Sequence, residues 1–212
     1  HTRYWRDWSS DVCSSDLNSF YRLNGRDYDV GLHAVTNFTE KGAKKGPLAR
    51  ILRQLRFKWE DFALAPQKGS RVVFPQAELK FNNEVDLLRA EIASAFPSQI
   101  DHFEDLLRKV VDYDDLDQEM FEISSRTILA ETFSEPLLIE MLLCPLMWYG
   151  NAAEEDMAWG QFCIMFRSIF MEGFARPYKG VRLILKNLVK RFRGDRKSTS
   201  LNSSHANISY AV

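Results

Sequence analysis

The sequence predicts an α+β fold that is mostly helical. From about residue 83 onward, apolar residues recur at the three- and four-residue spacing of amphipathic helices. Near the start, short alternating segments flank Asn24-Gly25, which is a strong hairpin signal. The 212 residues are 45% hydrophobic, which is enough for a packed core and excludes wholesale disorder.

The extended segments are expected in the first half of the chain. Residues 19–23 alternate and are rich in aromatic side chains, so they predict a strand, and residues 27–33 predict a second extended piece after the Asn24-Gly25 turn. Residues 40–47 contain two Gly, one Pro and three Lys and predict an exposed loop. Residues 71–74 and 79–81 predict a second hairpin.

Helices are expected in most of the remainder. Residues 48–57 have helical apolar spacing. Asn83 predicts the N-cap of a helix over residues 85–96, and Ser98 the cap of the next helix, over residues 100–111. Residues 124–174 are strongly helical and unusually apolar, with Pro136 near a helix start. Residues 179–193 predict an amphipathic basic helix.

Charge and composition exclude several function classes. Lys+Arg 28 against Asp+Glu 29 gives a net charge of -1, which argues against a nucleic-acid partner. No apolar run reaches the roughly 18 residues that span a bilayer. Three scattered Cys exclude a disulfide framework and a CxxC metal site. His33 and His102 are too isolated to predict metal ligation, and the acidic residues 112–117 predict a solvated turn rather than a calcium loop.

The two ends are expected to be foreign to the fold. Asp195-Arg196-Lys197-Ser198-Thr199 is the translation of GAT CGG AAG AGC ACA, a sequencing-adapter sequence, and the reverse complement of the same adapter encodes residues 7–17. We therefore interpret residues 1–17 and 195–212 as adapter-derived tails and expect them to lie unpacked on the surface. Residues 18–194 are then expected to be an internal fragment of a longer protein.

Two features leave alternatives open. Residues 137–174, rich in Met and aromatic side chains, could be ordinary core or the lining of a site for a long apolar ligand. The basic helix over residues 179–193 could pack as a surface helix or lie on a membrane. No serine-hydrolase, zinc-protease, P-loop or dinucleotide-binding motif occurs in the chain, and Cys144 and Cys163 predict buried, inert thiols.

Two segments carry a resemblance to a known family. The first contains Asn24-Gly25 followed by Tyr28-Asp29-Val30-Gly31-Leu32-His33, and the second reads Gly173-Phe174-Ala175-Arg176-Pro177-Tyr178-Lys179-Gly180-Val181. In this order, around a helical insert, they resemble FAD-dependent oxidoreductases of the phytoene desaturase and carotenoid isomerase type, within the flavin amine oxidase superfamily. That family has an "fDvGxH" piece leading toward the flavin and a "G…yPkGG" step opening a helix. Val181 departs from the pattern by replacing the second glycine of the step.

The resemblance implies a two-domain FAD-binding α/β parent. Residues 18–45 would be its flavin-proximal strand segment and residues 46–194 its mainly helical substrate-binding region. The implied cofactor is FAD, with hydride transfer between the flavin and an apolar, isoprenoid- or carotenoid-like small molecule in a desaturation, saturation or isomerisation; amine oxidation is a weaker alternative. Asp29, Gly31 and His33 are the implied near-flavin residues, through backbone contacts more than acid–base roles. For Asp29 the alternative is a carboxylate that caps a turn.

The same resemblance limits what this chain does alone. The glycine-rich fingerprint that binds the pyrophosphate is not in the sequence, so we expect poor FAD binding and no turnover by the fragment. No catalytic residue and no metal ligand is assigned. The alternative is a non-catalytic helical module that binds lipid or a membrane surface through residues 137–148 and the basic helix. We expect a cytoplasmic location, with peripheral membrane contact and oligomeric state left open.

Overall fold

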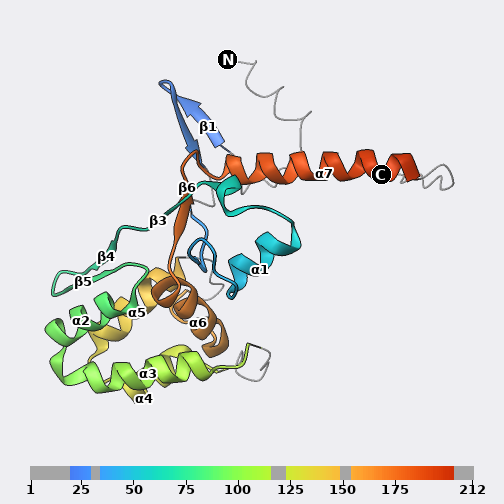
Figure 1. Ribbon diagram of the computed structural model, residues 1–212. Coiled ribbons are helices and arrows are strands. Elements are labelled where there is room, and N and C mark those ends of the chain that lie inside the picture. The colour runs from blue at the N-terminus through green and yellow to red at the C-terminus, as the bar shows by residue number, and fades with distance from the viewer. Residues whose placement is uncertain (1–19, 30–33, 116–122, 149–153, 203–212) are drawn as a thin grey trace. The chain divides into compact units, whose positions relative to one another are not determined.

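Figure 1 shows the computed structural model, which describes residues 20–29, 34–115, 123–148 and 154–202. The chain divides into two compact units, each assembled from stretches that are separate in sequence. Unit 1 comprises His1–Ala34, Phe57–Leu64 and Arg176–Val212, and unit 2 comprises Val35–Arg56 and Ala65–Ala175. The fold is α+β and mostly helical with small antiparallel sheets, which confirms the predicted class at this level.

The predicted N-terminal hairpin is present in unit 1. Strand β1 (Phe20–Leu23) pairs antiparallel with β2 (Arg26–Asp29). The two residues between them, Asn24 and Gly25, have φ of 51° and 75°, as a type I′ turn requires. Tyr21 and Tyr28 face each other across the strands with ring centroids 5.1 Å apart, so an aromatic cross-strand pair fixes the register.

The C-terminal helix of unit 1 is longer than predicted. Helix α7 (Arg182–Asn202) begins three residues after the predicted start and continues past residue 194, where the adapter-derived tail is expected to begin. Near its start it contacts the 3-10 helix η2 (Trp59–Phe62), and Asn187 donates a hydrogen bond of 2.5 Å to the carbonyl oxygen of Asp61. The N-terminal tail, residues 1–17, lies outside the described residues.

Unit 2 contains the second predicted hairpin and most of the helices. Strand β4 (Ser70–Val73) pairs with β5 (Glu78–Phe81), as predicted. The helices are α1 (Pro47–Gln54), α2 (Val85–Ala95), η3 (Pro97–Gln99), α3 (Ile100–Asp112), α4 (Ser125–Thr132), α5 (Pro136–Met147), α6 (Trp159–Phe166) and the π-helical turn η5 (Arg167–Met171). Strands β3 (Leu64–Pro66) and β6 (Ala175–Pro177) form a further two-stranded sheet.

An aromatic column along α6 and η5 forms the core of unit 2. Its members are Trp159, Phe162, Phe166 and Phe170, whose successive ring centroids lie 5.2, 5.5 and 4.9 Å apart. Phe81 of β5 meets Phe170 edge to face at 4.9 Å, and Phe103 of α3 lies 6.3 Å from Phe166. The column therefore joins the β4–β5 hairpin to the helices, and all its phenylalanines are 1% exposed or less.

The π-helical turn keeps Phe170 in line with this column. In an α-helix each four-residue step overshoots a full turn by about 40°, because the helix has 3.6 residues per turn. Steps from Phe162 to Phe166 and on to Phe170 would therefore drift away from one face. A π turn forms i to i+5 hydrogen bonds and has more residues per turn, so the last four-residue step falls short instead and offsets the drift.

The predicted capping roles of Asn83 and Ser98 are wrong. The N-cap residue of α2 is Glu84, without a side-chain cap. Asn83 instead donates to the carbonyl oxygen of Phe174 at 2.9 Å and accepts from its amide at 2.8 Å, a contact between residues far apart in sequence. Ser98 lies inside η3, and the residue preceding α3 is Gln99. Gln99 is 2% exposed and its side chain bonds to Ser134.

Gly173 lies directly against Asn83. A Cβ atom at this glycine would lie 2.0 Å from Asn83 Oδ1 and 2.7 Å from Asn83 Cα, and its φ is +78°. The glycine is therefore required both by its left-handed backbone and by the close approach of Asn83.

Truncating the aromatic column should destabilise unit 2. We expect Phe166→Ala to lower the free energy of unfolding by about 3–5 kcal/mol, because a fully buried ring is lost and a cavity remains. Val111→Ala, at a side chain that is 54% exposed, should change it by no more than about 0.5 kcal/mol. Urea unfolding followed by helical circular dichroism measures both, and equal costs would contradict the assignment of the column as the core.

Candidate functional site

Asp29, the last residue of β2, is the predicted near-flavin residue that can be examined. Gly31 and His33 lie outside the described residues. The Asp29 side chain is 3% exposed. Its Oδ2 accepts hydrogen bonds from Arg176 Nη2 at 3.0 Å and from the amide of Val181 at 3.3 Å. The carboxylate is therefore held by the segment that carries the second family-like motif.

A second carboxylate and two more arginines extend this cluster. Arg182 Nη1 lies 3.8 Å from Asp29 Oδ1, and Arg182 Nη2 lies 3.3 Å from Asp27 Oδ2. Arg22 Nε donates to Asp27 at 2.8 Å. This hydrogen bond from Arg22, with the charges of Arg182 and Arg22, holds the pKa of Asp27 below its ordinary value despite partial desolvation. Ion pairs thus connect the β1–β2 hairpin to the start of α7.

Gly180 allows the close approach of Asp29 to the start of α7. Its φ is +77°, and a Cβ atom there would lie 2.4 Å from Asp29 Oδ2. The Gly180 amide donates to the carbonyl oxygen of Pro177 at 2.8 Å and closes a turn. Val181, which replaces the second glycine of the family pattern, is 4% exposed. Its side chain is buried in unit 1 while its amide bonds to Asp29.

This geometry gives Asp29 a positioning role. One carboxylate oxygen is occupied by Arg176 and Val181, and the other is buried and accepts no hydrogen bond from the residues that the structure describes. Protein groups therefore cover the carboxylate, which suits holding the 177–181 turn better than contacting a bound cofactor. Arg176 and Gly180, both within the second family-like motif, and Arg182 belong to the cluster, although none of them was predicted as a site residue.

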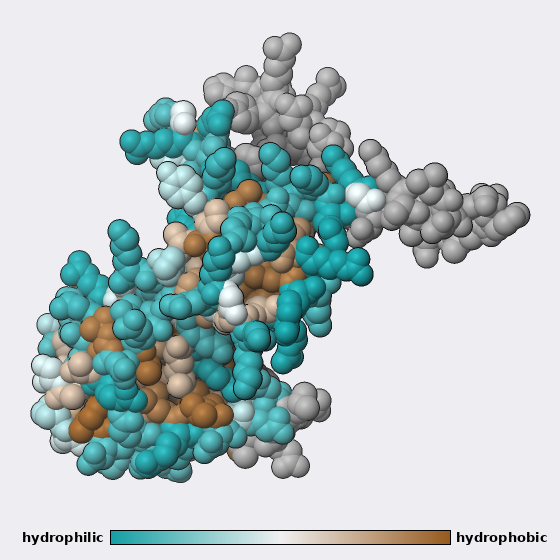
Figure 2. All heavy atoms as spheres, in the orientation of Figure 1, coloured by the Kyte–Doolittle hydropathy of each residue, from teal (hydrophilic) through white to brown (hydrophobic). Residues whose placement is uncertain are grey.

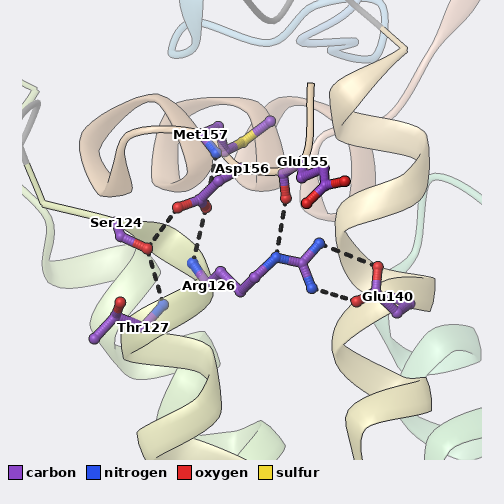
Figure 3. Close-up of polar contacts among 7 residues, drawn as sticks. All are labelled: Ser124, Arg126, Thr127, Glu140, Glu155, Asp156 and Met157. Carbon is purple, nitrogen blue, oxygen red and sulfur yellow. Dashed lines mark hydrogen bonds and ion pairs between the residues drawn. The ribbon is translucent and has the colours of Figure 1, made fainter. Parts of the chain in front are cut away.

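A second polar cluster in unit 2 fastens three separate segments together (Figure 3). Asp156 Oδ2 accepts from the Ser124 hydroxyl at 2.5 Å, and Asp156 Oδ1 accepts from the amides of Arg126 and Met157 at 3.0 and 2.8 Å. Ser124 caps α4 by accepting from the Thr127 amide at 3.0 Å. The carboxylate thereby satisfies the Arg126 amide in the first turn of α4, which would otherwise lack a partner, and the amide of Met157.

Arg126 continues the network from α4 to α5. Its guanidinium donates to both carboxylate oxygens of Glu140 and to the carbonyl oxygen of Glu155. The hydrogen bonds to Glu140 raise the pKa of Arg126 above its ordinary value. The contacts drawn are the Arg126–Glu140 salt bridge, the Ser124 cap of α4 and hydrogen bonds to the 155–157 segment, so this cluster stabilises the packing of α4 on α5. The serine preceding α4 was the only local signal for it in the sequence.

In the apolar stretch over residues 137–174, most of the apolar side chains that the structure describes are buried or partly buried in unit 2. On α5 the buried side chains are Leu138, Ile139, Met141, Leu142, Leu143 and Leu146, whereas Trp148 just after the helix is 85% exposed. Among the described residues, no group of three or more His, Cys, Asp or Glu side chains could hold a metal ion. Within the same residues, no helix combines the length and the apolar character needed to cross a membrane.

No protein-family model, curated protein or solved structure that was compared with the chain gives a significant match.

Adding a methyl group at two glycines should separate backbone strain from collision with Asp29. Gly25 and Gly180 have nearly equal φ, but nothing lies within 4 Å of a Cβ at Gly25. We expect Gly25→Ala to cost about 1–2 kcal/mol from the left-handed backbone alone, and Gly180→Ala to cost a further ~1–3 kcal/mol from overpacking. Hydrogen exchange of residues 181–190 should accelerate in Gly180→Ala only. Equal effects would show that Asp29 does not hold this turn.

Cys163 should be chemically inert until unit 2 unfolds. Burial raises the pKa of its thiol to about 12; the positive charge of Arg167 opposes this shift, and the negative charge of Asp115 adds to it. The folded thiol stays protonated, so its contribution to stability is full below the ordinary value of 9.0 and falls as pH rises toward about 12. At pH ~8, where an ordinary thiol is partly ionised, iodoacetamide should label the partly exposed Cys144 before Cys163, and denaturant should equalise the two by mass spectrometry. Early labelling of Cys163 would contradict its burial.

Proposed function

We propose that this chain is the flavin-proximal strand segment and the substrate region of an FAD-dependent oxidoreductase of the phytoene desaturase type. The observation that carries the proposal is the contact of Asp29 with Arg176 and Val181. The two motifs that resemble the family are some 150 residues apart in sequence. Motifs that serve one cofactor have to meet in the fold, and within unit 1 these two are joined through Asp29.

The cofactor and the residues of the chain have different roles in this proposal. FAD, when bound, supplies the acceptor or donor of hydride. Asp29 positions the 177–181 turn and the first turn of α7 relative to β2. Gly31 and His33 remain the candidates for backbone contacts near the cofactor. No side chain of the chain is assigned a proton-transfer step.

The proposed substrate is an apolar small molecule, isoprenoid- or carotenoid-like, that undergoes desaturation, saturation or isomerisation. The interior of unit 2 between α5 and α6 is made of aliphatic and aromatic side chains. A charged substrate would suit such surroundings poorly, because an unpaired charge costs several kcal/mol to bury. The alternative of a non-catalytic lipid-binding module relies on the same apolar composition. On α5, however, half of the side chains are buried and, of the rest, all but Pro136 are partly buried, so the helix exposes little apolar surface.

A chimera tests the proposal. Residues 18–194 would replace the matching segment of a phytoene desaturase, and the purified protein would be examined for flavin absorbance and for oxidation of its polyene substrate. We expect the chimera to retain FAD, and Asp29→Ala to lower its flavin content at least fivefold because the 177–181 turn loses its anchor.

The matched control is Asp112→Ala, which removes an exposed carboxylate at the end of α3 and should leave the flavin content unchanged. A chimera with native-like circular dichroism and no flavin would refute the proposal.

A further inference from the structure

The loop before α1 and helix α1 itself form a basic surface on unit 2. Over residues 41–56 the chain carries six basic side chains and no acidic one, namely Lys41, Lys44, Lys45, Arg50, Arg53 and Arg56. All six are exposed. We call this set the α1 basic surface. The whole chain has a net charge of -1, so positive charge is concentrated here against an overall balance.

Most of this charge is left uncompensated by the protein. Among the residues that the structure describes, no acidic side chain forms an ion pair with Lys44, Lys45, Arg50 or Arg53. Arg176 of β6 and Arg182 at the start of α7 differ, because they form ion pairs with Asp29 and Asp27. A surface with several unpaired cations attracts an anionic partner.

Apolar side chains lie beside these cations. Leu48, Ala49 and Leu52 face the interior and attach α1 to unit 2, whereas Ile51 is 50% exposed and Leu55, one turn further on, is 41% exposed. In Figure 2, brown apolar and teal hydrophilic side chains are both visible in the region where Figure 1 draws α1. The exposed face of the helix therefore combines aliphatic groups with arginines.

Glycines shape the loop that presents the lysines. Gly42 and Gly46 have φ of 89° and 100°, conformations that residues with side chains rarely adopt. Gly46 packs against the Thr39 methyl group, where a Cβ would lie 2.6 Å away. Pro47 then starts α1. The loop therefore ends at Gly46. Lys44 and Lys45 lie just before the helix that carries Arg50 and Arg53.

We propose that the α1 basic surface docks the protein onto an anionic lipid bilayer. Lysine and arginine side chains would bind the headgroup phosphates, while Ile51 and Leu55 enter the boundary between headgroups and acyl chains. Charge alone would suit nucleic acid equally, but phosphate binding to a duplex gives no role to two exposed aliphatic side chains beside the cations. The inference goes beyond the proposed function and does not depend on flavin binding.

Sedimentation of the full chain with lipid vesicles tests whether the basic side chains of the α1 basic surface contribute to binding. We expect binding to vesicles of phosphatidylcholine with phosphatidylglycerol, and at least tenfold weaker binding to phosphatidylcholine alone. Lys44→Glu with Lys45→Glu should weaken binding at least tenfold, since each basic residue near the surface contributes roughly fivefold. The matched control, Lys68→Glu with Lys80→Glu, changes two exposed lysines elsewhere in unit 2 by the same charge and should stay within twofold.

A second pair of variants tests the apolar part at constant charge. Ile51→Asn should weaken vesicle binding several-fold, whereas Val111→Asn, at a similarly exposed valine of α3, should not. Circular dichroism verifies that each variant is folded.

Three results would overturn the proposal. The first is that the chain binds neutral and anionic vesicles equally well, or binds neither. The second is loss of binding in Lys186→Glu with Lys190→Glu of α7 but not in the α1 variants. The third is tighter binding to duplex DNA than to the anionic vesicles.

Discussion

The aromatic column along α6 is the contact on which the rest of unit 2 depends. Phe166 and Phe170 connect α3 and β5 to the same helix, so elements that are far apart in sequence share one set of rings. The π-helical turn belongs to this contact, because it keeps the last ring on the face of the others. Fully buried aromatic side chains remove more apolar area from water than any other core residues, and the short β4–β5 hairpin would be marginal without such a partner.

Local patterns in the sequence predicted the elements well and their long-range partners poorly. The first hairpin followed from Asn24-Gly25, the second from two short extended runs, and the helices from apolar spacing. Asn83 failed as a predicted cap because the backbone of Phe174 competes for the same side chain. Ser98 failed because a 3-10 turn brings Gln99 to the start of α3. Neither competitor is visible within a local window of sequence.

At the candidate site, too, one residue could be predicted from the sequence and its long-range partners could not. Asp29 was singled out in the sequence, but its partners Arg176 and Arg182 lie about 150 residues away, and no spacing rule connects them. The proposed resemblance concerns both segments but does not indicate that they touch. Their contact explains why Gly180 is a glycine and how Val181 can replace one, since the amide of Val181 serves Asp29 while its side chain is buried.

The fit of Gly173 against Asn83 also restricts how this protein can vary. Most steric conflicts between two side chains can be relieved by making the partner smaller. Here a Cβ at position 173 would meet the Cα atom of residue 83, which every amino acid possesses, at 2.7 Å. A suppressor mutation at position 83 therefore cannot rescue a larger residue at position 173, and any such rescue would have to move the backbone itself.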